Sequence, residues 1–218
     1  MSEPTNTSDP APDAPPSFIY GATRDWPGYF ASVAGKPARE TLIEAFNRFE
    51  DDTPTTAIDL GCGEGRDTQE LLERGWQVLA IDGSQVGIDQ LLKRPGLANH
   101  ARLTTRVSSF EELGDLPQVR LLNASFSIPF CIPEYFASFW TTMTTAIEPG
   151  GRFCGQLFGD RDSWATIPDR SHQTRAEAKA LFEGFDLEMF DEEERDKQDY
   201  QGTVKRWHVF HIVARKQS

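Results

Sequence analysis

The chain has 218 residues and a formal net charge of −12. An acidic balance of this size argues against anionic partners, so we expect no nucleic-acid partner and no membrane surface. Hydrophobic residues make up 38% of the chain and charged residues 26%, which is a globular composition, and the length predicts one domain with a self-sustaining core.

The cysteines and the apolar runs indicate the cellular location of the protein. Cys62, Cys131 and Cys154 have no C-x-x-C spacing, which favours a reducing, cytoplasmic location over a disulfide framework. No run is long enough to span a bilayer, and the first residues lack the basic and apolar regions of a secretory signal. No metal cluster is expected either, because His208 and His211 are three residues apart on a predicted strand and point to opposite faces.

The N-terminal part divides into three segments. Residues 1–17 are rich in Pro, Asp, Ser and Thr and predict a disordered tail, so the single domain should span residues 18–218. Residues 18–50 then form an N-terminal segment of that domain. It begins with an aromatic cluster around Pro27-Gly28, which either packs on the sheet edge or covers a binding site: Phe18, Tyr20, Trp26, Tyr29 and Phe30. Residues 37–49 have a helical apolar period, with Pro37 in the first turn.

A strand, a glycine turn and a helix follow. Residues 56–60 form an apolar, strand-like run, and residues 68–74 have a helical pattern. Between them Gly61, Gly63 and Gly65 stand at alternate positions, and Asp59 lies two residues before the first glycine. Glycine tolerates positive φ and lets a ligand approach the backbone, while the start of the helix favours an anion. An ordinary turn without a ligand is the alternative, but turn chemistry alone does not require three patterned glycines.

The next predicted strand ends in Asp82, which lies 21 residues after Gly61 (82 − 61 = 21). In nucleotide-binding βαβ units an acid at about this position accepts hydrogen bonds from ribose hydroxyls. Ser84 is the better N-cap for the helix over residues 85–94, which leaves Asp82 freer for a ligand.

The acid-x-G-x-G-x-G pattern of Asp59, Gly61, Gly63 and Gly65 resembles the first motif of the class I S-adenosylmethionine (SAM)-dependent methyltransferases. The dinucleotide fingerprint G-x-G-x-x-G has a different spacing. The resemblance extends from about residue 37 to residue 216 and is nearest to small-molecule enzymes of the thiopurine and tellurite-resistance type. It implies an α/β three-layer sandwich, with a seven-stranded, mostly parallel sheet that ends in an antiparallel β-hairpin.

The remaining elements agree with that fold. Strands are predicted at residues 102–107, 119–124 and 151–158, and helices at 134–147 and 174–182, the last with Thr174 as N-cap. Pro149-Gly150-Gly151 is expected to separate helix from strand. Strands at 185–194 and 203–215, joined by a polar connection, form the terminal hairpin.

The resemblance implies SAM as the cofactor, and Phe110 is expected to lie against its adenine ring. The family often has an acid near Ser109 that contacts the adenine amino group, and this sequence departs from that pattern. Arg39 is either a contact to the SAM carboxylate or a solvated surface residue, and Trp26 and Tyr29 are candidates for a lid. The expected cofactor-binding residues are Asp59, Gly61, Cys62, Gly63, Gly65, Asp82, Gly83, Ser109, Phe110, Asn123, Trp26 and Arg39.

The acceptor is expected at the carboxyl ends of the later strands. Residues 125–133 form an apolar, proline-stiffened loop that either walls the acceptor pocket or packs on the next helix. The expected substrate-binding residues are Phe126, Phe130, Tyr135, Trp164 and Tyr29. Asp160 and Asn123 are the expected catalytic residues; a hydroxyl acceptor needs a general base, for which Asp160, Asp162 and His172 are candidates.

The sequence therefore predicts a SAM-dependent methyltransferase that acts on a small-molecule acceptor by in-line displacement, as a monomer or homodimer. Two alternatives stay open. A non-catalytic SAM-binding sensor would have the same glycine loop, and a nicotinamide oxidoreductase is disfavoured by the glycine spacing and the terminal hairpin.

Overall fold

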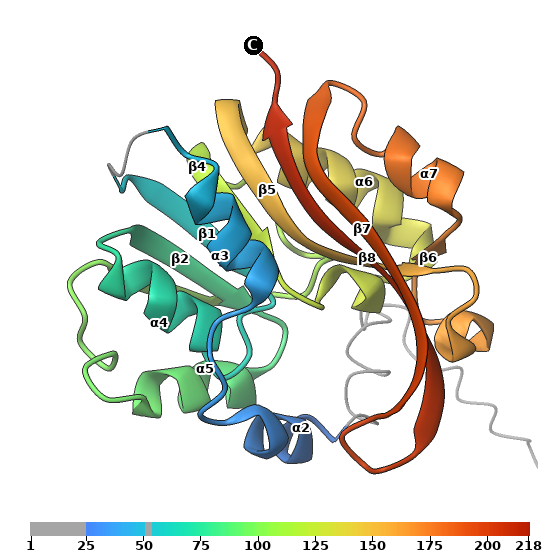
Figure 1. Ribbon diagram of the computed structural model, residues 1–218. Coiled ribbons are helices and arrows are strands. Elements are labelled where there is room, and N and C mark those ends of the chain that lie inside the picture. The colour runs from blue at the N-terminus through green and yellow to red at the C-terminus, as the bar shows by residue number, and fades with distance from the viewer. Residues whose placement is uncertain (1–24, 51–53) are drawn as a thin grey trace, which may run out of the picture.

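The computed structural model describes residues 25–50 and 54–218 (Figure 1). The predicted tail at residues 1–17 lies outside the described residues, as do Phe18 and Tyr20. In the described part, eight strands form one sheet, and seven of them follow the order β3-β2-β1-β4-β5-β8-β7. The predicted seven-stranded sheet is confirmed, and the short β6 beside β5 is an addition that the sequence pattern did not predict.

The strands are β1 (Thr56–Leu60), β2 (Gln77–Asp82), β3 (Leu103–Val107), β4 (Val119–Ala124), β5 (Ile147–Gly159), β6 (His172–Gln173), β7 (Phe185–Gln198) and β8 (Val204–Lys216). The pairs from β3 through β5 are parallel, as is the β5–β6 pair. Strand β8 runs antiparallel to both β5 and β7, so the sheet ends in the predicted hairpin. Because β1 to β5 are parallel, their carboxyl ends meet at one edge of the sheet, where open α/β folds bind ligands.

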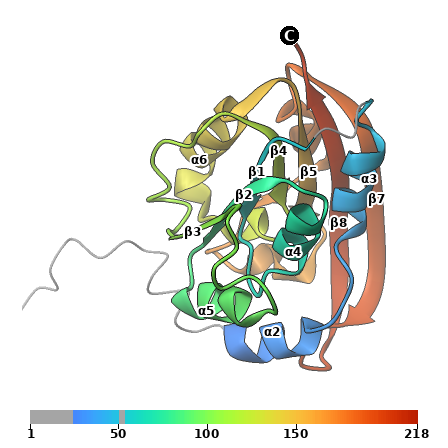
Figure 2. The same ribbon diagram turned by 90° about the vertical axis from the view of Figure 1, so that its left-hand side faces the viewer.

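Helices cover both faces of the sheet, and each face has its own apolar core (Figure 2). On one face lie α3 (Glu40–Asn47), α4 (Arg66–Glu73) and α5 (Gln85–Lys93), which bury Leu42, Leu71 and Leu91 completely. On the other face lie α6 (Pro133–Thr145) and α7 (Arg175–Ala180), whose Phe139, Trp140 and Ala178 pack against β4 and β5 residues. Thr174 caps α7 as predicted, in a reciprocal capping box with Glu177.

Two predicted boundaries are wrong for identifiable reasons. The helix expected at residues 37–49 begins only at Glu40, because the Arg39 N–H donates to the Asp67 carboxylate at 2.8 Å while Arg39 stays extended. The segment Pro149-Gly150-Gly151 lies inside β5 and does not precede it. Strand β5 already pairs at Ile147 with Val119, and a register shift in the β4–β5 ladder accommodates the extra residues.

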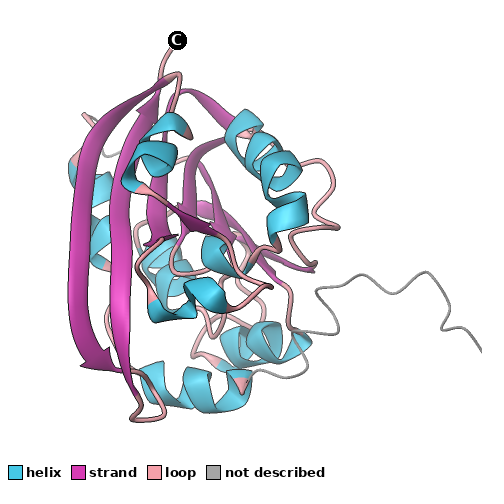
Figure 3. Cartoon of the chain, turned by 90° about the vertical axis from the view of Figure 1, so that its right-hand side faces the viewer, coloured by secondary structure: helices cyan, strands magenta, loops and turns pink. Residues whose placement is uncertain are grey.

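The hairpin is longer than its hydrophobic pattern predicts. Its pairing continues to Gln198 opposite Val204, so the predicted polar connection is strand through Gln198 and turn only after it. Cross-strand ion pairs such as Arg206–Glu194 (2.9 Å) stabilise this polar part. Both strands extend past the sheet toward the short helix α2 (Trp26–Val33), as Figures 1 and 3 show, and Tyr200 at the turn makes an edge-to-face contact with Tyr29 at 5.7 Å.

None of the helices within residues 25–50 and 54–218 has the length and apolar character needed to cross a membrane.

Candidate active site

A cavity of about 930 Å³ lies at the carboxyl ends of the parallel strands. Its volume is near the upper end of the usual range for ligand sites, roughly 300–1,000 Å³. The lining residues come from the turns after β1, β2, β3, β4 and β5, and from α2 and the hairpin turn. This cavity thus lies at the sheet edge where the topology predicts a ligand.

The loop that contains Gly61, Gly63 and Gly65 packs closely against other parts of the protein. Gly61 and Gly65 have φ of +74° and +85°, and a Cβ on them would lie 2.2 Å from Ser127 and 2.6 Å from Leu91. Gly63 also has positive φ and packs against Phe30 of α2. The Gly61 and Cys62 N–H groups both donate to the Ile81 carbonyl. The spacing of the glycines therefore follows from how the loop packs on β2, α2 and α5, as much as from access by a ligand.

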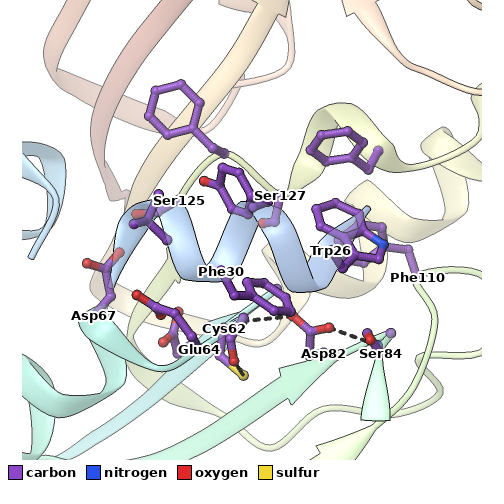
Figure 4. Close-up of a pocket in the computed structure, with 18 of the residues that line it drawn as sticks. Trp26, Phe30, Cys62, Glu64, Asp67, Asp82, Ser84, Phe110, Ser125 and Ser127 are labelled. Carbon is purple, nitrogen blue, oxygen red and sulfur yellow. Dashed lines mark hydrogen bonds between the residues drawn. The ribbon is translucent and has the colours of Figure 1, made fainter. Parts of the chain in front are cut away.

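Asp82 joins the glycine loop to the end of β2 (Figure 4). Its Oδ2 accepts from the Gly63 N–H and its Oδ1 accepts from the Ser84 N–H, both at 2.8 Å. The expectation that Ser84 would cap α5 and leave Asp82 free is wrong. The Ser84 hydroxyl makes no capping bond, because Asp82 turns back on the backbone two residues ahead. Burial raises the pKa of Asp82, and the two N–H donors oppose that rise.

A buried carboxylate cluster lies behind the loop. Asp59 accepts from the Thr68 hydroxyl at 2.5 Å and from the Asn123 amide at 2.8 Å. The same amide donates to Asp67 at 3.1 Å. Burial and the neighbouring Asp67 charge raise the pKa of Asp59 to about 7, with Thr68 and Asn123 opposing the rise. Asp59 and Asp67 also line the cavity, so the cluster offers negative charge to a cationic group there.

At the cavity, Arg66 and Glu111 carry buried polar atoms that make no hydrogen bond. Nε and Nη1 of Arg66, at the start of α4, have no hydrogen-bond partner, and its nearest carboxylate oxygen, from Asp67, is 3.9 Å from Nε. Burial and the neighbouring Arg39 lower the pKa of Arg66. Both carboxylate oxygens of Glu111, after β3, are likewise buried and unpaired. Buried polar groups normally have partners, so these two are complementary to a ligand with an anionic end and an amino-group end.

The other part of the cavity is aromatic. Phe126 and Phe130 follow β4, Phe158 ends β5, and Trp164 and Trp207 come from the loop after β5 and from β8. Phe130 and Phe158 lie 6.4 Å apart by ring centroids, and Trp164 lies 5.7 Å from Trp207. We call these five rings the aromatic compartment.

Helix α2 and the hairpin turn close the same cavity. Trp26 packs on Phe130 at 5.2 Å and on Phe30 at 6.0 Å, and Tyr29 contacts Tyr200. The Tyr29 hydroxyl accepts from the Arg39 guanidinium at 3.1 Å. The described part of the N-terminal aromatic segment, α2, therefore packs on the protein and also lines the cavity.

Most of the predicted ligand residues lie at the cavity. The predicted cofactor residues on its wall are Asp59, Gly61, Cys62, Gly63, Asp82, Gly83, Ser109, Phe110, Trp26 and Arg39, and the predicted acceptor residues there are Phe126, Phe130, Trp164 and Tyr29. Arg39 is half-buried, which excludes the solvated-surface interpretation. Its guanidinium lies 4.4 Å above the Phe126 ring.

Four predicted site residues are not on the cavity wall. Gly65 packs against Leu91 behind the loop, and Tyr135 packs against the core under α6. Asn123 is completely buried, with its amide used by Asp59 and Asp67, so it positions the carboxylates and does not reach the cavity. Asp160 is largely exposed and faces Arg161 and His208. The catalytic roles expected for Asn123 and Asp160 therefore have no geometric basis.

The other candidate bases are also engaged elsewhere. Asp162 is buried, ion-paired with Lys205, and accepts from the N–H groups of Trp164 and His208. His172 packs on Phe158 at 5.9 Å and is not on the cavity wall, and burial lowers its pKa. In the described part of the chain, neither side chain can take a proton from an acceptor in this cavity.

Sequence reasoning missed several lining residues, namely Glu64, Arg66, Asp67, Glu111, Ser125, Ser127, Phe158, Arg170, Tyr200 and Trp207. Arg66 and Asp67 directly follow the last motif glycine, so their place at a helix start was a usable signal. The sequence held no such signal for Tyr200 and Trp207, because only the length of the hairpin brings them to the cavity.

Comparisons with known proteins agree with this architecture. Residues 57–151 match a family model described as a methyltransferase domain. No curated protein sequence matches the chain. Among solved structures, TehB from Haemophilus influenzae has a TM-score of 0.72 at 18% identity, over 88% of this chain and 67% of its own.

Two further structures are similar over nearly the whole chain. The Burkholderia thailandensis 1,6-didemethyltoxoflavin-N1-methyltransferase has a TM-score of 0.62 at 19% identity and covers 100% of both chains. The magnesium protoporphyrin IX methyltransferase of Synechocystis has a TM-score of 0.68 at 11% identity, over 95% of this chain and 100% of its own. Residues 57–151 are therefore similar to a methyltransferase domain, and the chain has the Rossmann-like α/β fold of these solved structures, in agreement with the resemblance of its glycine loop to the class I SAM-dependent enzymes.

Proposed function

We propose that the chain transfers a methyl group from SAM to a small molecule that binds in the aromatic compartment. One observation carries the proposal. The glycine loop, Asp82 and the turn after β3 line one continuous cavity with the aromatic compartment. A cofactor along the first three would therefore present its reactive group beside an acceptor in the compartment.

The charges of the wall fit the two ends of SAM. In Figure 4, Asp67 and Ser125 lie toward one end of the cavity, and Ser84 and Phe110 lie toward the other, with Asp82 beside Ser84. The carboxylates near Asp59 would bind the ammonium of the methionyl part, and the unpaired Arg66 guanidinium would bind its carboxylate. Asp82 would accept from the ribose hydroxyls.

The adenine end has its own candidates. The family often has an acid near Ser109, and Glu111 is two residues further along. Its buried, unpaired oxygens on the cavity wall make it the best acceptor for the adenine amino group. Phe110 lines the same end and would lie against the adenine ring, with its other contact to Phe139 at 4.7 Å.

SAM supplies an activated methyl group on sulfur, so the protein has mainly to position the acceptor and keep water away. Helix α2 and the hairpin turn would do this from one side, with Tyr29 against Tyr200. The compartment would hold the acceptor in line with the methyl group from the other side. No side-chain base is assigned, because Asp162 and His172 do not line the cavity.

The related structures support a small acceptor. The B. thailandensis enzyme was crystallised with 1,6-didemethyltoxoflavin and S-adenosylhomocysteine (SAH), and the Synechocystis enzyme with SAM. The acidic net charge also supports a small molecule over nucleic acid, and three free, buried cysteines support a reducing, cytoplasmic location. A monomer or a homodimer is compatible with this assignment.

Transfer of a labelled methyl group tests the proposal. Purified protein is incubated with methyl-labelled SAM and a low-molecular-mass cell extract, and the products are separated from unreacted SAM. We expect label in a small molecule with the wild type and none with Asp82→Ala. Binding of SAM without any transfer would favour the non-catalytic sensor, and binding of NADH in place of SAM would favour the oxidoreductase.

A further inference from the structure

A glutamine lies in the interior of β5, where its neighbours in the strand are apolar. Gln156 is only 1% exposed, and Cys154, Leu157 and Phe158 beside it are buried as well. A buried side-chain amide is costly unless its oxygen and its NH₂ group have hydrogen-bond partners. The partners of Gln156 therefore indicate why a polar residue stands at this position.

Both ends of the amide are used, by residues from two other parts of the fold. Oε1 of Gln156 accepts from the Phe126 N–H at 2.9 Å, and Nε2 donates to the Thr41 hydroxyl of α3 at 3.0 Å. A backbone N–H can only donate, so the amide oxygen has to face Phe126 and the NH₂ group has to face Thr41. Gln156 thereby ties the turn after β4 to a fixed point inside the sheet.

The residue that Gln156 holds has an unusual backbone conformation. Phe126 has φ of +54° and is the one non-glycine residue with positive φ within residues 25–50 and 54–218. This region is unfavourable for a bulky side chain, so the conformation persists only where the surroundings fix it. The hydrogen bond to Gln156 supplies such a constraint, because it fixes the direction of the Phe126 N–H.

The Phe126 ring lies in the cavity wall and supports other residues of that wall. The Arg39 guanidinium lies 4.4 Å from the ring centroid, and its Nη2 donates to the Tyr29 hydroxyl of α2 at 3.1 Å. The ring also has an edge contact to Phe158, with 6.4 Å between the centroids. Gln156 itself is not a lining residue, so any effect that it has on a bound molecule passes through Phe126.

The glycine loop does not depend on this hydrogen bond. Ser127, which follows Phe126, donates from its hydroxyl to the Leu60 carbonyl at 2.6 Å and packs on Gly61. Loss of the bond between Gln156 and Phe126 leaves both contacts of Ser127 in place. A change at Gln156 should therefore affect the aromatic compartment and not the cofactor.

We propose that Gln156 is a positioning residue of the acceptor site. It holds Phe126 in the left-handed conformation, which places the ring against the bound acceptor and, through Arg39 and Tyr29, keeps α2 over the site. The inference rests on the proposed function and adds to it a residue that determines acceptor binding without contacting the acceptor or SAM.

Calorimetric titration of the SAH-saturated protein with 2-naphthol, a flat aromatic probe of the compartment, tests the inference. We expect Gln156→Leu to weaken 2-naphthol binding about tenfold, because Phe126 relaxes and its ring leaves the wall, while SAH affinity changes less than about twofold. Unchanged affinity for 2-naphthol in Gln156→Leu would overturn the inference. A wild type that does not bind 2-naphthol would also overturn it, because the Phe126 ring would then contact no ligand.

Two further variants separate positioning from a purely structural role. Gln156→Glu keeps an oxygen for the Phe126 N–H, and Thr41→Val removes only the other hydrogen bond of the amide. Both should lose stability in urea denaturation, since the first buries a carboxyl group and the second leaves the amide NH₂ group without its partner. Both should still bind 2-naphthol within about twofold of the wild type. Probe affinity that falls in step with stability across the three variants would contradict the positioning role.

A double-mutant cycle tests whether the effect passes through the Phe126 ring. In the Phe126→Ala background the ring is absent, so adding Gln156→Leu should weaken 2-naphthol binding less than about twofold further. An equal loss in both backgrounds would contradict the route through Phe126. SAH binding distinguishes the two proposals. Its failure in the wild type would remove the proposed function and this inference together, whereas SAH binding with the wrong order of variants would remove this inference alone.

Discussion

The cofactor end and the aromatic compartment of the cavity are built in different ways. The cofactor end consists of short segments that follow strand ends, residues 59–67, 82–85 and 107–112. The compartment brings together α2, the loop after β4, the loop after β5 and the hairpin turn. The first is fixed mainly by backbone conformation at glycines, and the second by packing of distant side chains. Substitutions at the two ends should therefore have separable effects.

The largest effect on stability is expected for Gly65→Val, which disturbs the backbone conformation of the cofactor end. The new side chain would need φ of +85° and would meet the buried Leu91, whereas Gly96→Val needs φ of +80° with nothing within 4 Å. We expect Gly65→Val to lower the free energy of unfolding by about 2 kcal/mol more than Gly96→Val does. Urea denaturation measures both, and equal losses would mean that the loop is not held by this packing.

Arg66→Met tests the charge of the cofactor end. Removing the unpaired guanidinium should weaken SAH binding about 30-fold, because a charged hydrogen bond contributes roughly 2 kcal/mol. Methylthioadenosine lacks the amino-acid part, so its affinity should not change. The free energy of unfolding should change little, since Nε and Nη1 of Arg66 make no hydrogen bond and its ion pair with Asp67 is long, at 3.9 Å. Equal losses for both ligands would place the carboxylate elsewhere.

The pH dependence of SAH binding tests the carboxylate cluster. In the proposed binding mode the ammonium of SAH needs ionised Asp59, whose pKa in the folded protein is about 7. Affinity should therefore rise about tenfold between pH 6 and pH 8. Asp59→Asn should flatten this dependence, and a flat profile in the wild type would exclude Asp59 as the ammonium partner.

The same group has the opposite effect on the stability of the free protein. The folded pKa lies above the ordinary value of 3.8, so the folded state holds the proton more tightly than the unfolded state. Asp59 should therefore reduce stability as pH rises from about 4 to 7. In thermal unfolding, the melting temperature of Asp59→Asn should rise relative to that of the wild type over that pH range. Melting temperatures that change in parallel with pH would contradict the raised pKa of Asp59.

The smallest effect on SAH is expected for Tyr200→Ala, which opens the hairpin side of the compartment. SAH affinity should stay within about twofold, because Tyr200 contacts Tyr29 and not the glycine loop. Binding of 2-naphthol to the SAH complex should weaken about fivefold, by the loss of an aromatic contact worth roughly 1 kcal/mol. A larger loss of affinity for SAH than for 2-naphthol would show that the cofactor end and the aromatic compartment are not separable.

The contrast between the cofactor end and the aromatic compartment also explains which site residues could be predicted from the sequence. Gly61, Gly63, Asp82 and the strands around them were predicted because local spacing determines the turns in which they lie. Asn123 was placed by its position at the end of a strand and Asp160 by its position just after one, but a side chain's direction depends on partners that spacing does not reveal. Asn123 turns inward to Asp59 and Asp67, and Asp160 turns outward to Arg161.

The reach of the hairpin was not predictable for a different reason. Residues 195–203 are polar and carry no alternation that marks a strand. Cross-strand ion pairs and pairing with β8 extend the strand through Gln198, and residues 199–203 form the turn. Tyr200 and Trp207 reach the cavity only through that tertiary pairing, so the compartment had to be seen in three dimensions.

Calorimetric titration with SAH, and with NADH in parallel, tests the central claim most directly. The wild type and Asp89→Ala, an exposed control on α5, should bind SAH at one site per chain and should not bind NADH. Asp82→Ala should lose SAH binding, because Asp82 braces the Gly63 N–H and faces the cavity. Binding of NADH alone, or unchanged SAH binding by Asp82→Ala, would contradict the assignment of this cavity to SAM.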